Sequence, residues 1–152
     1  THWPQAVLGI AFNWGALMGW AAVHGNLTPA PWLLFCGCVL WTIGYDTIYA
    51  HQDKEDDALI GVKSTALRLG ANTLPWLALF FFAALALIDA AIWTAGGSII
   101  AHVGVAAAAL HAAWQLARFD HADAARCLEL FRSNRIFGLI ITLALVLDSL
   151  LA

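Results

Sequence analysis

The chain has 152 residues, of which 62% are hydrophobic and only 11% are charged, and its formal net charge is −3. A soluble domain is nearer half apolar and a quarter charged, so this composition excludes an ordinary soluble globule. Lipid must be the solvent for much of the surface, and no nucleic-acid partner is expected from so few basic residues.

Five apolar stretches approach the roughly 20 residues that a helix needs to cross a bilayer. Only helices and closed barrels satisfy their backbone in lipid, and these runs lack the period-2 alternation of barrel strands. The sequence therefore predicts an all-α, multi-span transmembrane helical bundle that forms a single domain over residues 1–152. The predicted spans are Pro4–Val23, Pro31–Ala50, Leu74–Thr94, Ser98–Ala117 and Ile136–Ala152.

The basic residues lie in only two connections, one after the second span and one between the fourth and fifth. Basic connections favour the cytoplasmic side, so both are expected there, with Thr1 cytoplasmic and Ala152 outside. The polar segment 118–135 is compatible either with a short amphipathic helix on the interface or with a plain connecting loop. The seven basic residues are Lys54, Lys63, Arg68, Arg118, Arg126, Arg132 and Arg135.

Carboxylates gather where the second span ends. If that helix continues through the segment, Asp53 and Asp57 fall about 20° to either side of Asp46, and the three form a single carboxylate face. Hard oxygen ligands of this kind suit Mg²⁺, and the nearby Lys63 and Arg68 would help to hold a diphosphate. A merely solvated loop would explain the neighbouring Glu55 and Asp56, but it explains Asp46 poorly because Asp46 lies within the apolar span.

The segment Asp46-x-x-Tyr49-Ala50-x-x-Asp53-x-x-Asp56-Asp57 resembles the second aspartate-rich motif of the UbiA superfamily of intramembrane prenyltransferases. The following Ile60–Ala66, the opening Thr1–Gly9 with Phe12-x-Trp14, and Phe131-x-x-Asn134-x-x-x-Gly138 are similar to the 4-hydroxybenzoate polyprenyltransferase subgroup. The resemblance covers essentially the whole chain.

This resemblance implies a nine-helix bundle in which the five spans correspond to helices five to nine. It implies Mg²⁺-dependent transfer of a polyprenyl group from polyprenyl diphosphate to the ring of 4-hydroxybenzoate, a step of ubiquinone biosynthesis, in a bacterial inner membrane. It also implies a first motif of the type Asn-Asp-x-x-Asp, which these 152 residues lack. The chain is therefore expected to begin mid-protein, to need N-terminal helices as partners and to be inactive alone.

The site residues expected from the motif and its surroundings fall into two groups. Asp46, Asp53 and Asp57 are the expected catalytic and metal-binding residues, and the substrate-binding residues are Lys63, Tyr49, Arg68 and Asn134. An aromatic pocket would protect an allylic cation from water, with Phe12, Trp14, Trp41 and Tyr49 as candidates. His51 is left out of the metal shell because it lies about 140° from Asp46 on a helix.

Other readings remain open at this stage. A UbiA-type enzyme could use another acceptor, and a membrane cation transporter could carry an acidic mouth, although its ionisable groups should extend through the bilayer centre. A non-catalytic subunit or a degraded remnant is a third reading. His102, His111 and Gln115 in the fourth span are expected to be structural, and Asp89 and Asp148 to snorkel or cap near the outer side.

Overall fold

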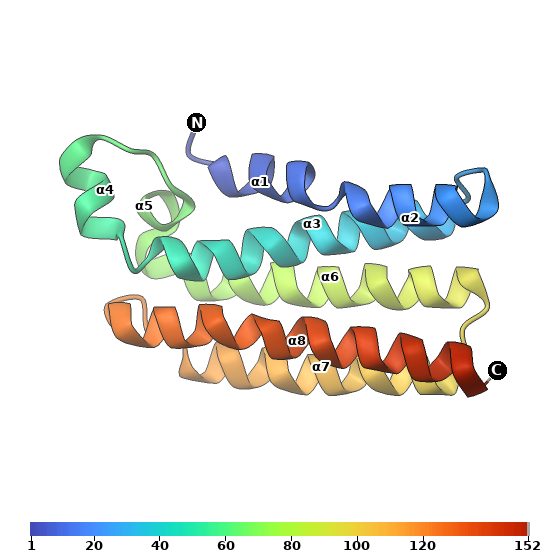
Figure 1. The fold of residues 1–152 in the computed structure, drawn as a ribbon. Coiled ribbons are helices and arrows are strands. Elements are labelled where there is room, and N and C mark those ends of the chain that lie inside the picture. The colour runs from blue at the N-terminus through green and yellow to red at the C-terminus, as the bar shows by residue number, and fades with distance from the viewer. Residues whose placement is uncertain (152) are drawn as a thin grey trace.

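The computed structural model describes residues 1–151, and all the regular elements in that range are helices (Figure 1). Ala152, the last residue of the fifth predicted span, lies outside the described residues. The helices are α1 (Pro4–Phe12), α2 (Trp14–His24), α3 (Pro29–Ala50), α4 (Lys54–Ile60), α5 (Thr65–Leu69), the short 3₁₀ helix η1 (Gly70–Asn72), α6 (Thr73–Ala95), α7 (Ile99–Arg118) and α8 (Ala124–Leu151).

The helices form five long rods that run back and forth, which confirms the predicted all-α, multi-span bundle. Five segments of the described chain are long and apolar enough to cross a membrane: Pro4–His24, Pro29–Ala50, Thr65–Ala95, Ile99–Arg118 and Ala124–Leu151. The protein is thus a multi-pass membrane protein. The N-terminus, α4 and the α7–α8 connection lie at one end of the rods, and the α2–α3 and α6–α7 turns lie at the other (Figure 1). Both basic connections therefore share an end, although which side of the membrane it faces stays a prediction.

The first rod is broken at Asn13, which the sequence did not predict. The Asn13 side-chain nitrogen donates to the Gly9 carbonyl at 2.7 Å and to the Thr42 hydroxyl at 2.9 Å. These bonds compete with the helical ladder and draw the chain toward α3, so α1 ends and α2 begins at this residue.

The fifth span is longer than the sequence predicted. Helix α8 begins at Ala124 rather than Ile136, and only residues 119–123 separate it from α7. Segment 118–135 is therefore neither a separate amphipathic helix nor a plain loop. The Asp123 carboxylate accepts from the Arg126 backbone N–H at 2.8 Å, and this cap starts the helix early.

Small residues set the spacing of the rods. A β-carbon added at Gly37 would lie 2.9 Å from Ile88 Cγ1, and one added at Gly44 would lie 2.7 Å from the ring of Phe81. Such contacts are tighter than packing allows, so α3 and α6 lie close together because glycine stands at these positions. Between α7 and α8, a β-carbon at Gly104 would overlap that of Ala144.

Candidate functional site at the end of helix α3

The carboxylate segment spans a helix break. Helix α3 ends at Ala50, residues 51–53 form a turn, and α4 starts at Lys54. The backbone N–H groups of His51 and Gln52 bond to carbonyls three residues back, at 3.2 and 2.8 Å, which tightens the last turn and ends α3. The continuous helix assumed for the shared carboxylate face is therefore wrong.

The carboxylates are divided between two helices. Asp46 is half-buried within α3, whereas Asp53 precedes α4 and Asp57 lies one turn along it, its backbone N–H bonded to the Asp53 carbonyl at 2.8 Å. Acidic side chains are favourable in the first turn of a helix, where unpaired N–H groups carry partial positive charge. That preference explains why so acidic a segment restarts as a helix.

The donor chemistry fits Mg²⁺, but a cage of three protein ligands is not formed. Within residues 1–151, no three His, Cys, Asp or Glu side chains stand close enough to hold one ion. In that same range Asp46, Asp53 and Asp57 form no side-chain hydrogen bond or ion pair, so their oxygens are free to bind a cation. Mg²⁺ usually takes only one or two protein carboxylates and completes its shell with water and phosphate oxygens.

An aromatic wall stands next to Asp46 in the α3 sequence. Trp41, Tyr45 and Tyr49 recur every four residues and so share one face of α3. The Tyr49 ring packs on Phe131 of α8 with centroids 4.7 Å apart, and Trp41 stacks on Phe137 at 4.9 Å. The structure thus brings Tyr49 and Trp41 together on the face turned toward α8. Phe12 and Trp14 lie elsewhere, exposed on the first rod.

Asn134 is buried, and protein groups occupy its amide. Its oxygen accepts from Trp41 Nε1 at 3.0 Å and Gln115 Nε2 at 3.3 Å, while its nitrogen donates to Gln115 Oε1 at 2.9 Å and the Leu130 carbonyl at 3.1 Å. An asparagine amide has two acceptor and two donor positions, and all four are used. A part for Asn134 in substrate binding stays a prediction, and its observed partners join α3, α7 and α8.

Arg68 of this segment lies against the start of the first rod. Lys63 is exposed between α4 and α5, and the Arg68 guanidinium lies 5.8 Å from the centre of the Trp3 ring. Helix α5 is fixed by Thr65, whose hydroxyl hydrogen-bonds to that of Thr47 at 2.8 Å and whose backbone N–H donates to Gln5 at 3.3 Å. This buried junction of Gln5, Thr47 and Thr65 was not predicted from the sequence. The polar residues Gln5 and Thr47 within apolar stretches could have indicated it.

A comparison with protein families decides the assignment. The model of the UbiA prenyltransferase family matches residues 1–141. The chain belongs to the UbiA prenyltransferase family. The resemblance seen in its aspartate-rich segment is thereby confirmed over nearly the whole length.

Three curated relatives of this UbiA-family chain, from rat, Caenorhabditis elegans and Arabidopsis thaliana, are named 4-hydroxybenzoate polyprenyltransferase, mitochondrial. The chain is 49% identical to the rat protein and 44% identical to the Caenorhabditis elegans protein, and each alignment covers 99% of the present chain. It is 47% identical to the Arabidopsis thaliana protein over 97% of its length. It spans only 40%, 43% and 36% of these three relatives. No solved structure matches it significantly.

His51 of this UbiA-family chain bonds to the start of α6. Its Nε2 lies 2.9 Å from the Thr73 hydroxyl, which itself donates to the Gly70 carbonyl. Burial, together with the charge of Lys54, lowers the pKa of His51 to about 4. His51 borders a cavity of about 590 Å³ whose described lining includes Glu55, Asp56 and His121 but not Asp46, Asp53 or Asp57.

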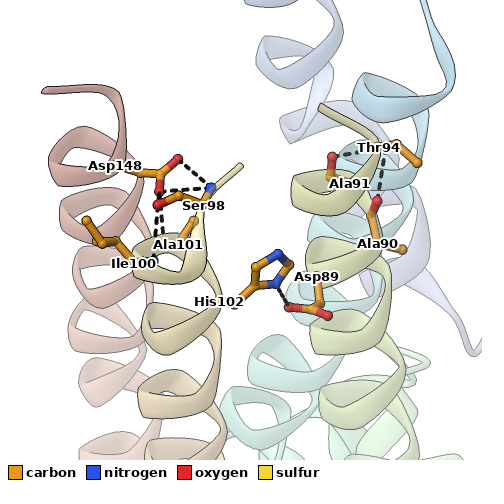
Figure 2. A network of polar contacts seen from close by, with 9 residues as sticks. All are labelled: Asp89, Ala90, Ala91, Thr94, Ser98, Ile100, Ala101, His102 and Asp148. Atoms are coloured by element: carbon orange, nitrogen blue, oxygen red, sulfur yellow. Dashed lines mark hydrogen bonds and ion pairs between the residues drawn. The ribbon is translucent and has the colours of Figure 1, made fainter. Parts of the chain in front are cut away.

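The polar residues of the fourth span bond to protein, as expected. His111 Nε2 donates to the Ser133 carbonyl at 3.1 Å, and Gln115 pairs with Asn134. At the far end of the rods, Asp89 accepts from His102 Nδ1 at 2.6 Å (Figure 2). Asp148 of α8 accepts from the backbone N–H groups of Ser98 and Ala101 and from the Ser98 hydroxyl, so it caps α7 as predicted (Figure 2).

Proposed function

We propose that this chain is the C-terminal part of an enzyme that transfers a polyprenyl group from polyprenyl diphosphate to the aromatic ring of 4-hydroxybenzoate, in ubiquinone biosynthesis. The names of the relatives support the substrates, and family membership supports the reaction class. The chain spans about two fifths of those relatives, so the proposal concerns the complete protein. The fragment is expected to be inactive alone.

One structural observation carries the proposal. Asp46 stands half-buried inside an apolar helix, one turn from Tyr49, and no described residue forms a side-chain hydrogen bond or an ion pair with it. A carboxylate in such a place is costly unless a cation meets it. The aromatic wall on the same helix suits the protection of an allylic group from water.

Each site residue has a proposed task. Asp46, Asp53 and Asp57 would hold Mg²⁺, singly or in pairs, and bound Mg²⁺ would stabilise the departing diphosphate oxygens as a Lewis acid. Lys63 and Arg68 would donate charge-assisted hydrogen bonds to that diphosphate. Tyr49 would cover the reacting carbon, and Asn134 would act on the site through Trp41. The isoprenoid tail would leave sideways into the lipid.

The setting of the enzyme is part of the proposal. We expect a bacterial inner membrane with the carboxylate end of α3 on the cytoplasmic side, where the basic connections lie. The relatives named above are mitochondrial proteins, so the type of membrane stays a prediction. A different aromatic acceptor would leave the roles of the carboxylates unchanged. The reading as a cation transporter has no specific support, because the mid-span His111 and Gln115 are bonded to α8.

The test replaces Asp46 by alanine in the complete protein and measures prenylation of labelled 4-hydroxybenzoate. Loss of electrostatic stabilisation of a leaving group should lower turnover about a hundredfold or more. Asp120→Asn is the matched control, because Asp120 is an exposed carboxylate at the same end of the rods. Near-normal turnover of Asp46→Ala would contradict the metal-ligand role. Transfer to a different phenol by the unmodified enzyme would instead correct the acceptor.

A further inference from the structure

A groove between α7 and α8 is separate from the carboxylate end of α3. It has a volume of about 450 Å³, and its lining includes Trp114 from α7 and Leu128, Arg132, Arg135 and Ile136 from α8. Leu128, Arg132 and Arg135 are three, four or seven residues apart, so they form one stripe along the helix, and Ile136 lies one turn beyond Arg132. None of the residues proposed for prenyl transfer lines this groove.

The arginines of this stripe lie near the basic end of the bundle. Asp148 caps α7 at the opposite end, and with a rise of 1.5 Å per residue Arg135 and Arg132 lie about 20 and 24 Å along α8 from it. The hydrocarbon layer is about 30 Å thick. Both positions lie within one hydrocarbon thickness of that cap, so a guanidinium there has to reach toward the interface or meet an anion.

The groove does not supply that anion from its own carboxylates. Both arginines are exposed, and within residues 1–151 neither forms an ion pair. Glu129 is the carboxylate in the described lining, and its closest basic group is Arg126, at 3.7 Å. The positive charge of Arg132 and Arg135 is thus open to an external partner.

Trp114 marks the polar end of the groove. Its ring stacks on His111 with centroids 5.2 Å apart, and the Arg118 guanidinium lies 5.2 Å from the centre of the same ring. Tryptophan with neighbouring arginine is typical of the headgroup level of a bilayer. Leu128 and Ile136 provide apolar surface beside the two arginines, where an acyl chain would lie.

We propose that this groove binds the headgroup of an anionic phospholipid from the leaflet at the basic end of the bundle. The planar guanidinium groups of Arg132 and Arg135 match the oxygens of a phosphodiester, and basic pockets between membrane helices are suited to such lipids. A lipid fits better than free phosphate because its acyl chains would contact the apolar residues of the groove, whereas a soluble anion would contact only the arginines. The inference does not depend on the proposed reaction, since it uses no residue of the α3 carboxylate segment.

The experiment uses the complete protein in bilayer discs of phosphatidylcholine with or without phosphatidylglycerol, followed by native mass spectrometry of the lipids that stay bound. Wild-type protein should retain phosphatidylglycerol over phosphatidylcholine. Arg132→Gln and Arg135→Gln should each weaken that retention about fivefold, and the double variant about tenfold or more. Arg126→Gln is the matched control, because Arg126 lies on α8 outside the groove lining and faces Glu129.

Several outcomes would overturn the proposal. Equal retention of the two lipids by wild-type protein would mean that something else, such as further helices of the complete protein, covers the groove. If Arg126→Gln weakened retention of phosphatidylglycerol as much as the groove variants do, the effect would come from general surface charge. Displacement of the lipid by inorganic phosphate would indicate a site for a soluble anion. The Arg132→Lys and Arg135→Lys variants, which keep the charge, guard against misfolding: they should retain part of the preference and melt like wild type.

Discussion

Trp41 and Asn134 are joined across α3 and α8 by a hydrogen bond of 3.0 Å from the indole Nε1 to the side-chain oxygen. Gln115 of α7 completes the junction with two more bonds to Asn134. Replacing Asn134 by leucine would leave buried polar groups on both neighbours without partners. We expect a loss of about 1–2 kcal/mol of stability, measured as a lower melting temperature in detergent.

A double variant separates this junction from simple packing. When Gln115→Leu is added to Asn134→Leu, the combined cost should be smaller than the sum of the two, because both members of the pair are then apolar. Ser149→Ala is the control, since its hydroxyl donates to a carbonyl on the exposed side of α8. Fully additive losses would show that the amide pair contributes nothing as a pair.

The spacing of α3 and α6 can be tested with alanine at Gly37. The new β-carbon would lie 2.9 Å from Ile88 Cγ1 and 3.0 Å from the Ala84 carbonyl oxygen, so backbone must move. We expect a destabilisation of about 1–3 kcal/mol in the same melting measurement. Gly19→Ala has no heavy atom within 4 Å of its new carbon and should be neutral or slightly stabilising. Equal effects of the two substitutions would argue against tight α3–α6 contact.

The cap that Asp148 places on α7 predicts a localised effect. Asp148→Ala leaves the backbone N–H groups of Ser98 and Ala101 without this acceptor, which should cost about 0.5–2 kcal/mol. Hydrogen exchange followed by mass spectrometry should show faster exchange in the first turn of α7 and unchanged exchange in α3. Unaltered protection at Ser98–Ala101 would mean that water or another group replaces the carboxylate.

Membrane orientation can be read from cysteine labelling. In a variant without the native cysteines, single cysteines at Ala58 and Ala124 should react with an impermeant reagent only from the cytoplasmic side. A cysteine at Leu27, in the turn between α2 and α3, should react only from the opposite side. All three positions are exposed, so accessibility should not limit the reaction. Labelling of Ala58 and Leu27 from one side would break the alternating topology.

The proposed diphosphate contact of Lys63 predicts a selective kinetic effect. Lys63→Ala should raise the KM for polyprenyl diphosphate several-fold and leave the KM for 4-hydroxybenzoate nearly unchanged, because the lost hydrogen bonds involve only the donor. Arg126→Ala is a suitable comparison, since it removes a half-buried cation elsewhere at the same end. An unaltered donor KM would remove Lys63 from the site.

The hydrophobic pattern predicted the number of spans and placed α3, α6 and α7 to within two residues at each end. It failed where polar side chains redirect the backbone. Asn13 breaks the first rod through a bond to Thr42, which is distant in sequence, and Asp123 starts α8 inside a segment whose charges had indicated a connection. Local capping and long-range bonds of this kind leave no periodic signal.

The same limit applies to the candidate site. The residue types of the carboxylate segment predict cation chemistry, and this stays a prediction. The assumption of one continuous helix was wrong because the last turn of α3 tightens before Asp53. Asn134 was singled out from its motif, yet its four bonds depend on the packing of three helices. Composition and spacing can point to a group, whereas its partners follow from the tertiary arrangement.

The glycine contacts between α3 and α6 restrict how the bundle can open. At Gly37 and Gly44 no side chain separates the two helices, so neither can slide along the other without a collision with Ile88 or Phe81. The two helices consequently behave as one rigid body that holds Asp46 in place. If the proposed function holds, a long-chain substrate would approach along the flanks of α3 that α6 leaves uncovered, and the other helices would set the width of its entrance.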